Sequence, residues 1–104
     1  MEITPTKFLF LVRLYNIYQK KEYMKEGFRT SHELSQSMDN SFNPSSYTRR
    51  VVRELLQERI LIISNGVKLD REKLAQLIKE QEFYKQIFQF LDSRTHSILD
   101  DIIY

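Results

Sequence analysis

The side chains best suited to chemistry gather between residues 43 and 59. This stretch contains hydroxyl side chains and three arginines, at Ser45, Ser46, Tyr47, Arg49, Arg50 and Arg53. A guanidinium can pair bidentately with guanine, and hydroxyls can contact bases or phosphates. These residues therefore predict a nucleic-acid-binding surface. The alternative is an ordinary solvated helix face, which an arginine cluster by itself would favour.

A helix over about residues 44–58 would place these side chains together. Asn43 is a suitable N-cap, and Pro44 suits the first helical position because its missing amide hydrogen is not needed there. Thr48, Val51, Val52 and Leu55 recur at helical spacing and form the expected inner face. We therefore expect the hydroxyls and arginines to be exposed.

A tight β-hairpin is predicted directly after this helix, within residues 60–69. Ile60–Ile63 has the composition of a buried strand, and Val67–Leu69 alternates inward and outward. The intervening Asn65-Gly66 is a strong turn signal, because both residues tolerate positive φ. Lys68 and Asn65 are candidate contacts to a phosphate or the minor groove. For Asn65 the purely conformational role is favoured, and for Lys68 neither interpretation prevails.

A second short helix is predicted ahead of the arginine helix, over about residues 31–38. Thr30 and Glu33 have capping-box spacing, and Leu34 and Met38 would be buried. A polar turn at 39–43 follows, with Phe42 expected to plug into the core. Two short helices joined in this way form a helix-turn-helix.

The residues just before this helix have two possible roles. Phe28-Arg29 is expected to be extended and could form a short strand. Arg29 and Ser31 stand at the head of the helix, where main-chain amides could hold a phosphate. Thr30 between them is more simply a cap.

Both ends of the chain are predicted to be helical. Thr4-Pro5 marks the start of a helix running to about Lys25, and its first three turns are apolar nearly all round, which suggests burial on two sides. Asp70 would cap a C-terminal helical region, residues 70–104, that is either one helix or two broken near Asp92-Ser93 with Ser93 as the second cap. Its residues form a heptad seam with two polar interruptions: Leu77, Gln81, Tyr84, Phe88, Leu91, Thr95, Ile98 and Ile102. The seam could pack on its own chain or on a second subunit, and we favour a homodimer built from the terminal helices.

Composition excludes several classes of function. With 104 residues the chain fits one domain, and the absence of cysteine excludes disulfides and thiolate catalysis. No signal peptide or apolar run long enough for a spanning helix is visible, so a cytoplasmic protein without membrane contact is expected. Residues 1–69 hold eleven Lys/Arg against seven Asp/Glu, whereas residues 70–104 hold five against seven. The positive charge thus lies with the candidate DNA-binding half.

The chain resembles the winged-helix superfamily, and in detail small dimeric transcription regulators of the MarR and PadR kind. Those families end the recognition helix with a leucine, three mostly charged residues, a glycine and an aliphatic pair; here the corresponding stretch is Leu55-Leu56-Gln57-Glu58-Arg59-Ile60-Leu61, with Arg59 where glycine is usual. The resemblance covers about residues 28–69. It implies a mainly α-helical winged helix-turn-helix with a small β-hairpin wing, N- and C-terminal flanking helices, and binding of double-stranded DNA.

The sequence thus predicts a homodimeric, sequence-specific DNA-binding protein that regulates transcription without catalysis. Helix 44–58 would enter the major groove, with the hairpin near the backbone or minor groove. His32 and His96 have no carboxylate spacing that suggests a metal site, and no cofactor or enzyme activity is expected. A small-molecule effector is left open. The alternative is a winged-helix module that binds a protein instead of DNA.

Overall fold

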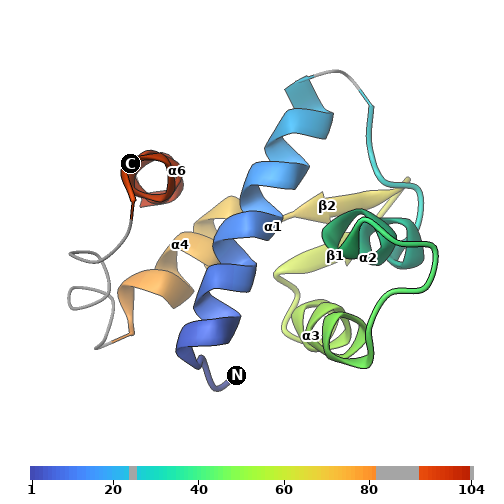
Figure 1. The fold of residues 1–104 in the computed structure, drawn as a ribbon, viewed down its shortest axis with the longest axis horizontal. Helices are drawn as coiled ribbons and strands as arrows, with labels where there is room; N and C mark the ends of the chain where they lie inside the picture. Colours follow the sequence, from blue (N-terminus) through green and yellow to red (C-terminus); the bar gives the residue numbers. More distant parts are fainter. Residues whose placement is uncertain (24–25, 82–91, 104) are drawn as a thin grey trace.

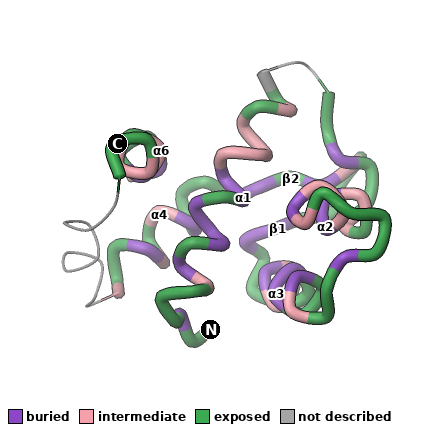
Figure 2. Tube along the Cα trace, in the orientation of Figure 1, coloured by how far each residue is buried: buried purple, intermediate pink, exposed green. Residues whose placement is uncertain are grey.

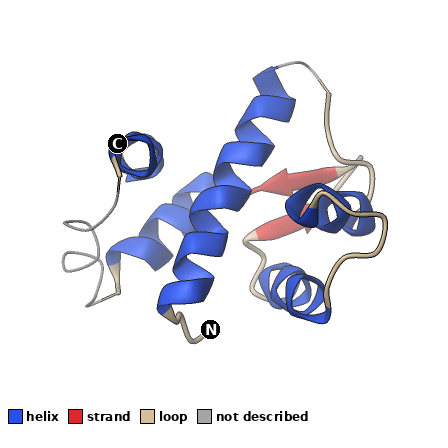
Figure 3. Ribbon diagram, in the orientation of Figure 1, coloured by secondary structure: helices blue, strands red, loops and turns tan. Residues whose placement is uncertain are grey.

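The computed structural model describes residues 1–23, 26–81 and 92–103. It is mainly helical with one antiparallel hairpin (Figures 1 and 3). In chain order the elements are α1 (Pro5–Tyr23), α2 (Ser31–Asp39), α3 (Ser46–Gln57), β1 (Leu61–Ile63), β2 (Val67–Leu69), α4 (Arg71–Lys79) and α6 (Ser93–Ile103). Among the helices that the structure describes, none has the length and apolar character needed to cross a membrane.

Helix α1 lies at the centre of the molecule (Figure 1). It packs on α2 at one side and on α6 at the other, and α6 also packs on α4. Phe8, Leu11 and Leu14 are completely buried. The expected burial of α1 on two sides is confirmed, and within one chain. Its apolar breadth therefore does not by itself require a second subunit.

Local capping signals correctly predicted three helix starts. The Thr4 hydroxyl accepts a hydrogen bond from the Lys7 amide, the Thr30 hydroxyl from the Glu33 amide and the Asp70 carboxylate from the Lys73 amide, each at 3.1 Å. The reciprocal half of the capping box differs from expectation. Glu33 accepts a hydrogen bond from the Arg29 amide at 3.3 Å, one residue before the cap.

Helix α3 begins two residues later than predicted. Ser45, with φ −64° and ψ 159°, is the N-cap, so the assignment of that role to Asn43 was wrong. The carboxylate of Asp39 accepts hydrogen bonds from the Ser45 amide at 2.6 Å and the Thr48 hydroxyl at 2.7 Å. These bonds tie the chain just before α3 to the end of α2, and Pro44 is buried beneath them.

The prediction that Phe42 fills the core was wrong, because its side chain is 88% exposed. Its carbonyl oxygen accepts a hydrogen bond from the Gln36 side-chain amide at 2.9 Å, and the neighbouring Ser41 hydroxyl accepts one from the Asn43 amide at 3.2 Å. This bonded turn carries the ring outward. Pro44 is the buried residue of the connection, most of which is exposed in Figure 2.

The hairpin forms as predicted, but β1 is less buried than expected. Its register pairs Leu61 with Leu69 and Ile63 with Val67. Leu61 is buried, whereas Ile62 and Ile63 are 41% and 59% exposed, because only the base of this short strand lies over the core. The extended conformation at Phe28 is confirmed as a single bridge to Val67, whose amide donates to the Phe28 carbonyl at 2.8 Å.

Three residues connect the two strands. Asn65 has φ 54° and Gly66 has φ 101°, so both adopt the left-handed conformation that the turn requires. A Cβ atom on Gly66 would also lie 2.9 Å from the Phe28 carbonyl oxygen. Glycine is therefore required here both by conformation and by the close approach of another backbone.

The C-terminal region is not one continuous helix, because α4 ends at Lys79 and α6 begins at Ser93. The cap of α6 is Asp92 rather than Ser93, since the Asp92 carboxylate accepts a hydrogen bond from the Thr95 amide at 2.7 Å. This bond is the main cause of the lowered pKa of Asp92. Leu99 and Ile102 are buried where α6 packs on α1 and α4. The middle of the predicted seam, residues 82–91, lies outside the described residues.

Candidate nucleic-acid interface

The outer face of α3 consists of polar and basic side chains. Ser46, Arg49, Arg50, Arg53 and Gln57 are all exposed, while Thr48, Val51, Val52 and Leu55 form the predicted buried face. Gln57 was not among the predicted contacts. Its spacing from Ser46, Arg50 and Arg53 places it on their side of the helix, so helical periodicity could have found it.

The acidic residue of α3, Glu54, and the C-cap residue Glu58 are engaged with cations at the flank of this face. Lys7 of α1 forms an ion pair with Glu54 at 2.8 Å, and the chain's terminal ammonium lies 3.6 Å from Glu58. The hydrogen bond from Lys7 is the largest cause of the lowered pKa of Glu54. The exposed face of α3 is consequently basic, with its carboxylates neutralised at the flank by groups from the N-terminal segment.

The three arginines divide between the two edges of the face. The guanidinium of Arg50 lies 5.5 Å from the centre of the Tyr47 ring, on the edge toward α1. Arg49 and Arg53 line a hollow on the other edge, toward α2. Among the described residues neither of these two arginines forms an ion pair. They are therefore available to an external anion.

The prediction that Tyr47 lies on the exposed face was wrong, because the residue is half-buried. Its ring packs edge-on against Phe10 of α1, with 6.0 Å between ring centres and an interplanar angle of 87°. Its hydroxyl is buried and forms no hydrogen bond with the described residues. The cause is that Tyr47 lies about 100° round the helix from Ser46, on the side that α1 covers.

Ser45 has a structural task that competes with ligand binding. Its hydroxyl oxygen accepts a hydrogen bond from the Thr48 amide and donates one to the Thr48 hydroxyl, both at 3.1 Å. Ser46 is exposed and forms no such cap. Of the two predicted serines, Ser46 is the better placed to contact a ligand.

Asp39 fixes the position of α3 relative to α2. Burial alone would raise the pKa of Asp39, but hydrogen bonds from Ser45 and Thr48, together with the charge of Arg13, outweigh it and leave the pKa lowered. The Arg13 guanidinium also donates to the Met38 carbonyl. The start of α3 is thus anchored to α2 by an ionised carboxylate, and α2 is anchored to α1.

The remaining predicted contacts lie at two other places. Arg29 is exposed and Ser31 half-buried at the head of α2, where Ser31 lines the hollow that also contains Arg49 and Arg53. Lys68 and Asn65 are exposed on the hairpin, in a separate hollow beside Gly27 and the end of α1. The structure therefore brings Ser31, but not Lys68 or Asn65, to the arginine face.

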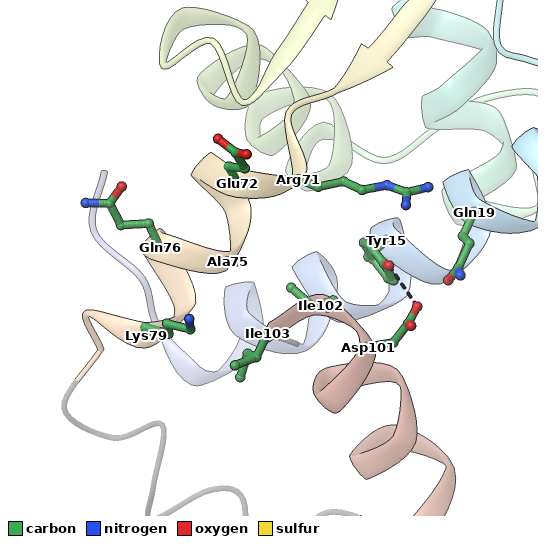
Figure 4. A pocket seen from close by; sticks show the side chains of 10 residues that line it. All are labelled: Tyr15, Gln19, Arg71, Glu72, Ala75, Gln76, Lys79, Asp101, Ile102 and Ile103. Carbon is green, nitrogen blue, oxygen red and sulfur yellow. Dashed lines mark hydrogen bonds between the residues drawn. The ribbon is translucent and has the colours of Figure 1, made fainter.

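A larger hollow of about 640 Å³ lies between α1, α4 and α6 (Figure 4). The Tyr15 hydroxyl donates to Asp101 at 2.8 Å across it, and the Arg71 guanidinium lies 5.7 Å from the Tyr15 ring centre. Burial, followed by the bond to Asp101, raises the pKa of Tyr15 to about 12. The lining mixes both signs of charge, with Arg71 and Lys79 against Glu72 and Asp101. Such a lining does not favour a polyanion.

No other site emerges in the described part of the chain. Its histidines and acidic residues form no group of three that could hold a metal ion. In comparisons with protein-family models, curated proteins and solved structures, nothing matched this chain.

Proposed function

We propose that this protein binds double-stranded DNA sequence-specifically, with α3 in the major groove, and regulates transcription. The observation that carries the proposal is the charge arrangement of α3. Arg49, Arg50 and Arg53 are exposed on one face, while Lys7 of α1 forms an ion pair with Glu54 at the flank. A helix face with this excess of positive charge attracts a polyanion.

The order of the elements supports a winged helix-turn-helix as the architecture. A helix, the single bridge at Phe28, two short helices and a hairpin follow one another, and Phe28 pairs with β2 at the edge away from β1. In helix-turn-helix proteins the N-terminal residues of the second helix contact base edges. Ser46 and Arg50 lie in that part of α3 and are exposed.

Within this proposal the exposed residues have different tasks. Ser46 and Arg50 would meet base edges, while Arg49 and Arg53, on the edge toward α2, and Gln57, further along α3, would reach the DNA backbone. Lys68 on the hairpin would contact a phosphate beside the site. Occupancy of the site would then block or recruit the transcription machinery.

A homodimer is the proposed binding form, because two copies would place two α3 helices about one DNA turn apart. The surface between α1 and α6 is the proposed contact. Leu9 is 48% exposed there, and it lines a hollow of about 390 Å³ with Val12 and Ile98. Analytical ultracentrifugation tests this part separately: a monomer at tens of micromolar would refute it.

The test of DNA binding is selection of bound duplexes from a random pool, followed by anisotropy titrations at several salt concentrations. Affinity should fall steeply with salt, because phosphate contacts release counterions. Arg50→Ala should cost about 1–3 kcal/mol and relax specificity at one base pair, whereas Arg49→Ala should weaken binding to all sequences alike. Lys73→Ala, which removes an exposed cation from α4, is the matched control and should bind as the parent does. Absence of salt-sensitive binding by the parent would refute the proposal.

A protein-docking module is the second candidate, favoured by the exposed apolar side chains of Phe42, Ile62 and Ile63. Solitary exposed apolar residues are common, so this observation is weaker than the charge arrangement. A stoichiometric protein partner whose capture is lost in Phe42→Ser, with DNA binding absent at low salt, would favour docking.

A further inference from the structure

A small basic hollow separates α2 from α3. Its volume is about 220 Å³, and it is lined by Ser31, His32, Ser35, Arg49, Val52, Arg53 and Leu56. No carboxylate is among these residues. His32, which has nothing in the sequence to indicate a role, is thereby placed beside the two arginines that form no ion pair with the described residues.

The polar groups of the hollow are not equivalent. Ser35 is 3% exposed, and its hydroxyl donates to the Ser31 carbonyl at 2.9 Å, so it is already satisfied. Val52 is buried and closes the floor. His32, Arg49 and Arg53 are exposed, and they are the groups that can meet a ligand from outside.

We propose that this hollow holds one backbone phosphate of DNA, and that His32 contacts it in the protonated form. The inference rests on the proposed DNA binding and adds that this binding is coupled to protonation of His32. Two guanidiniums without a carboxylate repel one another across a shared hollow, and an anion between them removes that repulsion. A phosphate is the anion that arginine pairs with best, and DNA supplies it next to the groove that α3 would occupy.

The charges around His32 set the sign of the pH dependence. Arg49 and Arg53 of α3 line the same hollow as His32. On its own helix, Glu33 follows it and accepts a hydrogen bond from the Arg29 amide. From α1, Arg13 reaches α2 at Met38, at the far end of that helix. A phosphate in the hollow would reverse the local balance and favour the charged imidazole.

DNA binding should therefore take up a proton at His32, and affinity should rise as the pH falls through the range in which histidine gains its charge. Uptake of one proton changes affinity by at most tenfold per pH unit. Between about pH 7.5 and about pH 6 the parent should bind about three- to tenfold more tightly. The log–log salt dependence should also become steeper by about 0.9 at the lower pH, because one more cation meets the DNA.

Three variants distinguish protonation of His32 from a general effect of pH on DNA affinity. His32→Gln should bind with the weaker, pH-independent affinity, and His32→Lys should bind tightly at both pH values. His96→Gln replaces the other histidine, on α6, which lies at the opposite end of the molecule from α2 and α3 (Figure 1). It should keep the full pH dependence. Thermal melting of each variant checks that the fold is unchanged, as expected at the exposed position of His32.

The duplex provides the complementary test. Single backbone phosphates of the duplex are replaced, one at a time, by neutral methylphosphonates. Replacement at one backbone position in each half-site should abolish the pH dependence of binding. Free inorganic phosphate should not take the place of the phosphate at that position. A parent that binds DNA without pH dependence, or a His32→Gln variant that keeps it, would overturn the inference and leave DNA binding intact. A parent that binds no DNA at either pH would instead refute the proposed function.

Discussion

Arg59 ends α3 in a backbone conformation that suits glycine better than arginine. Its φ is 58°, and the amides of Arg59 and Ile60 donate to the carbonyls of Leu56 and Leu55 at 3.2 and 2.9 Å. This pair of bonds is a Schellman motif, in which the left-handed residue is usually glycine. Arg59→Gly is therefore expected to stabilise the protein.

The size of the gain follows from two opposing effects. The left-handed conformation costs an L-residue about 1–2 kcal/mol. Glycine removes this cost, but its greater conformational freedom in the unfolded chain lowers the stability of the fold by about 0.5–1 kcal/mol. The net gain in the free energy of unfolding should be about 0.5–1 kcal/mol, which corresponds to a rise in Tm of about 2–8 °C for a domain of this size.

Thermal and urea unfolding of three variants measure this gain. Arg59→Ala removes the guanidinium but keeps Cβ, so it should remain within about 0.5 kcal/mol of the parent. Gln57→Gly places glycine in the last turn of α3 and should cost about 1 kcal/mol. If Arg59→Ala stabilises as much as Arg59→Gly, relief of charge repulsion is the cause. If neither variant stabilises, the strain argument is refuted.

Two further predictions concern the turn between α2 and α3. Phe42→Ser should change the free energy of unfolding in urea by no more than about 0.5 kcal/mol, because the ring is 88% exposed; a loss near the roughly 3–5 kcal/mol typical of a buried phenylalanine would show that the ring is buried after all. Asp39→Asn should cost about 1–3 kcal/mol at neutral pH, since it weakens charged hydrogen bonds to Ser45 and Thr48. The pKa of Asp39 is lowered by folding, so its stabilisation is present above the ordinary carboxyl pKa and is lost as pH falls through the lowered value. The difference between Asp39→Asn and the parent should therefore begin to close below about pH 4, and a gap independent of pH would exclude the ionised form as its source.

Features set by neighbouring residues could be predicted from the sequence. The caps at Thr4, Thr30 and Asp70 depend on a side chain meeting an amide three residues later, and all three are present. The left-handed turn at Asn65-Gly66 depends on those two residues alone. Such signals are complete within a few residues, so they hold without knowledge of the rest of the fold.

Features that depend on distant partners were predicted less well. The start of α3 was misplaced because Ser45 and Asn43 are both acceptable caps, and the Asp39 carboxylate, which belongs to another helix, decides between them. Phe42 was placed inside because large apolar residues usually are buried. The bond from the Gln36 side chain to the Phe42 carbonyl, which helps fix this turn, has no signature in the sequence.

In the candidate site, too, some features are set by neighbouring residues and others by distant partners. Periodicity separates the buried face of α3 from its polar face, but it does not say which edge of the polar face another helix covers. Helix α1 covers the edge with Tyr47, through Phe10, and engages Glu54 through Lys7. The opposite edge, with Arg49 and Arg53, stays open toward His32. The packing of α1 thus removes a tyrosine and an acidic residue from the prospective interface, and leaves a basic edge whose affinity for DNA the proton on His32 should adjust.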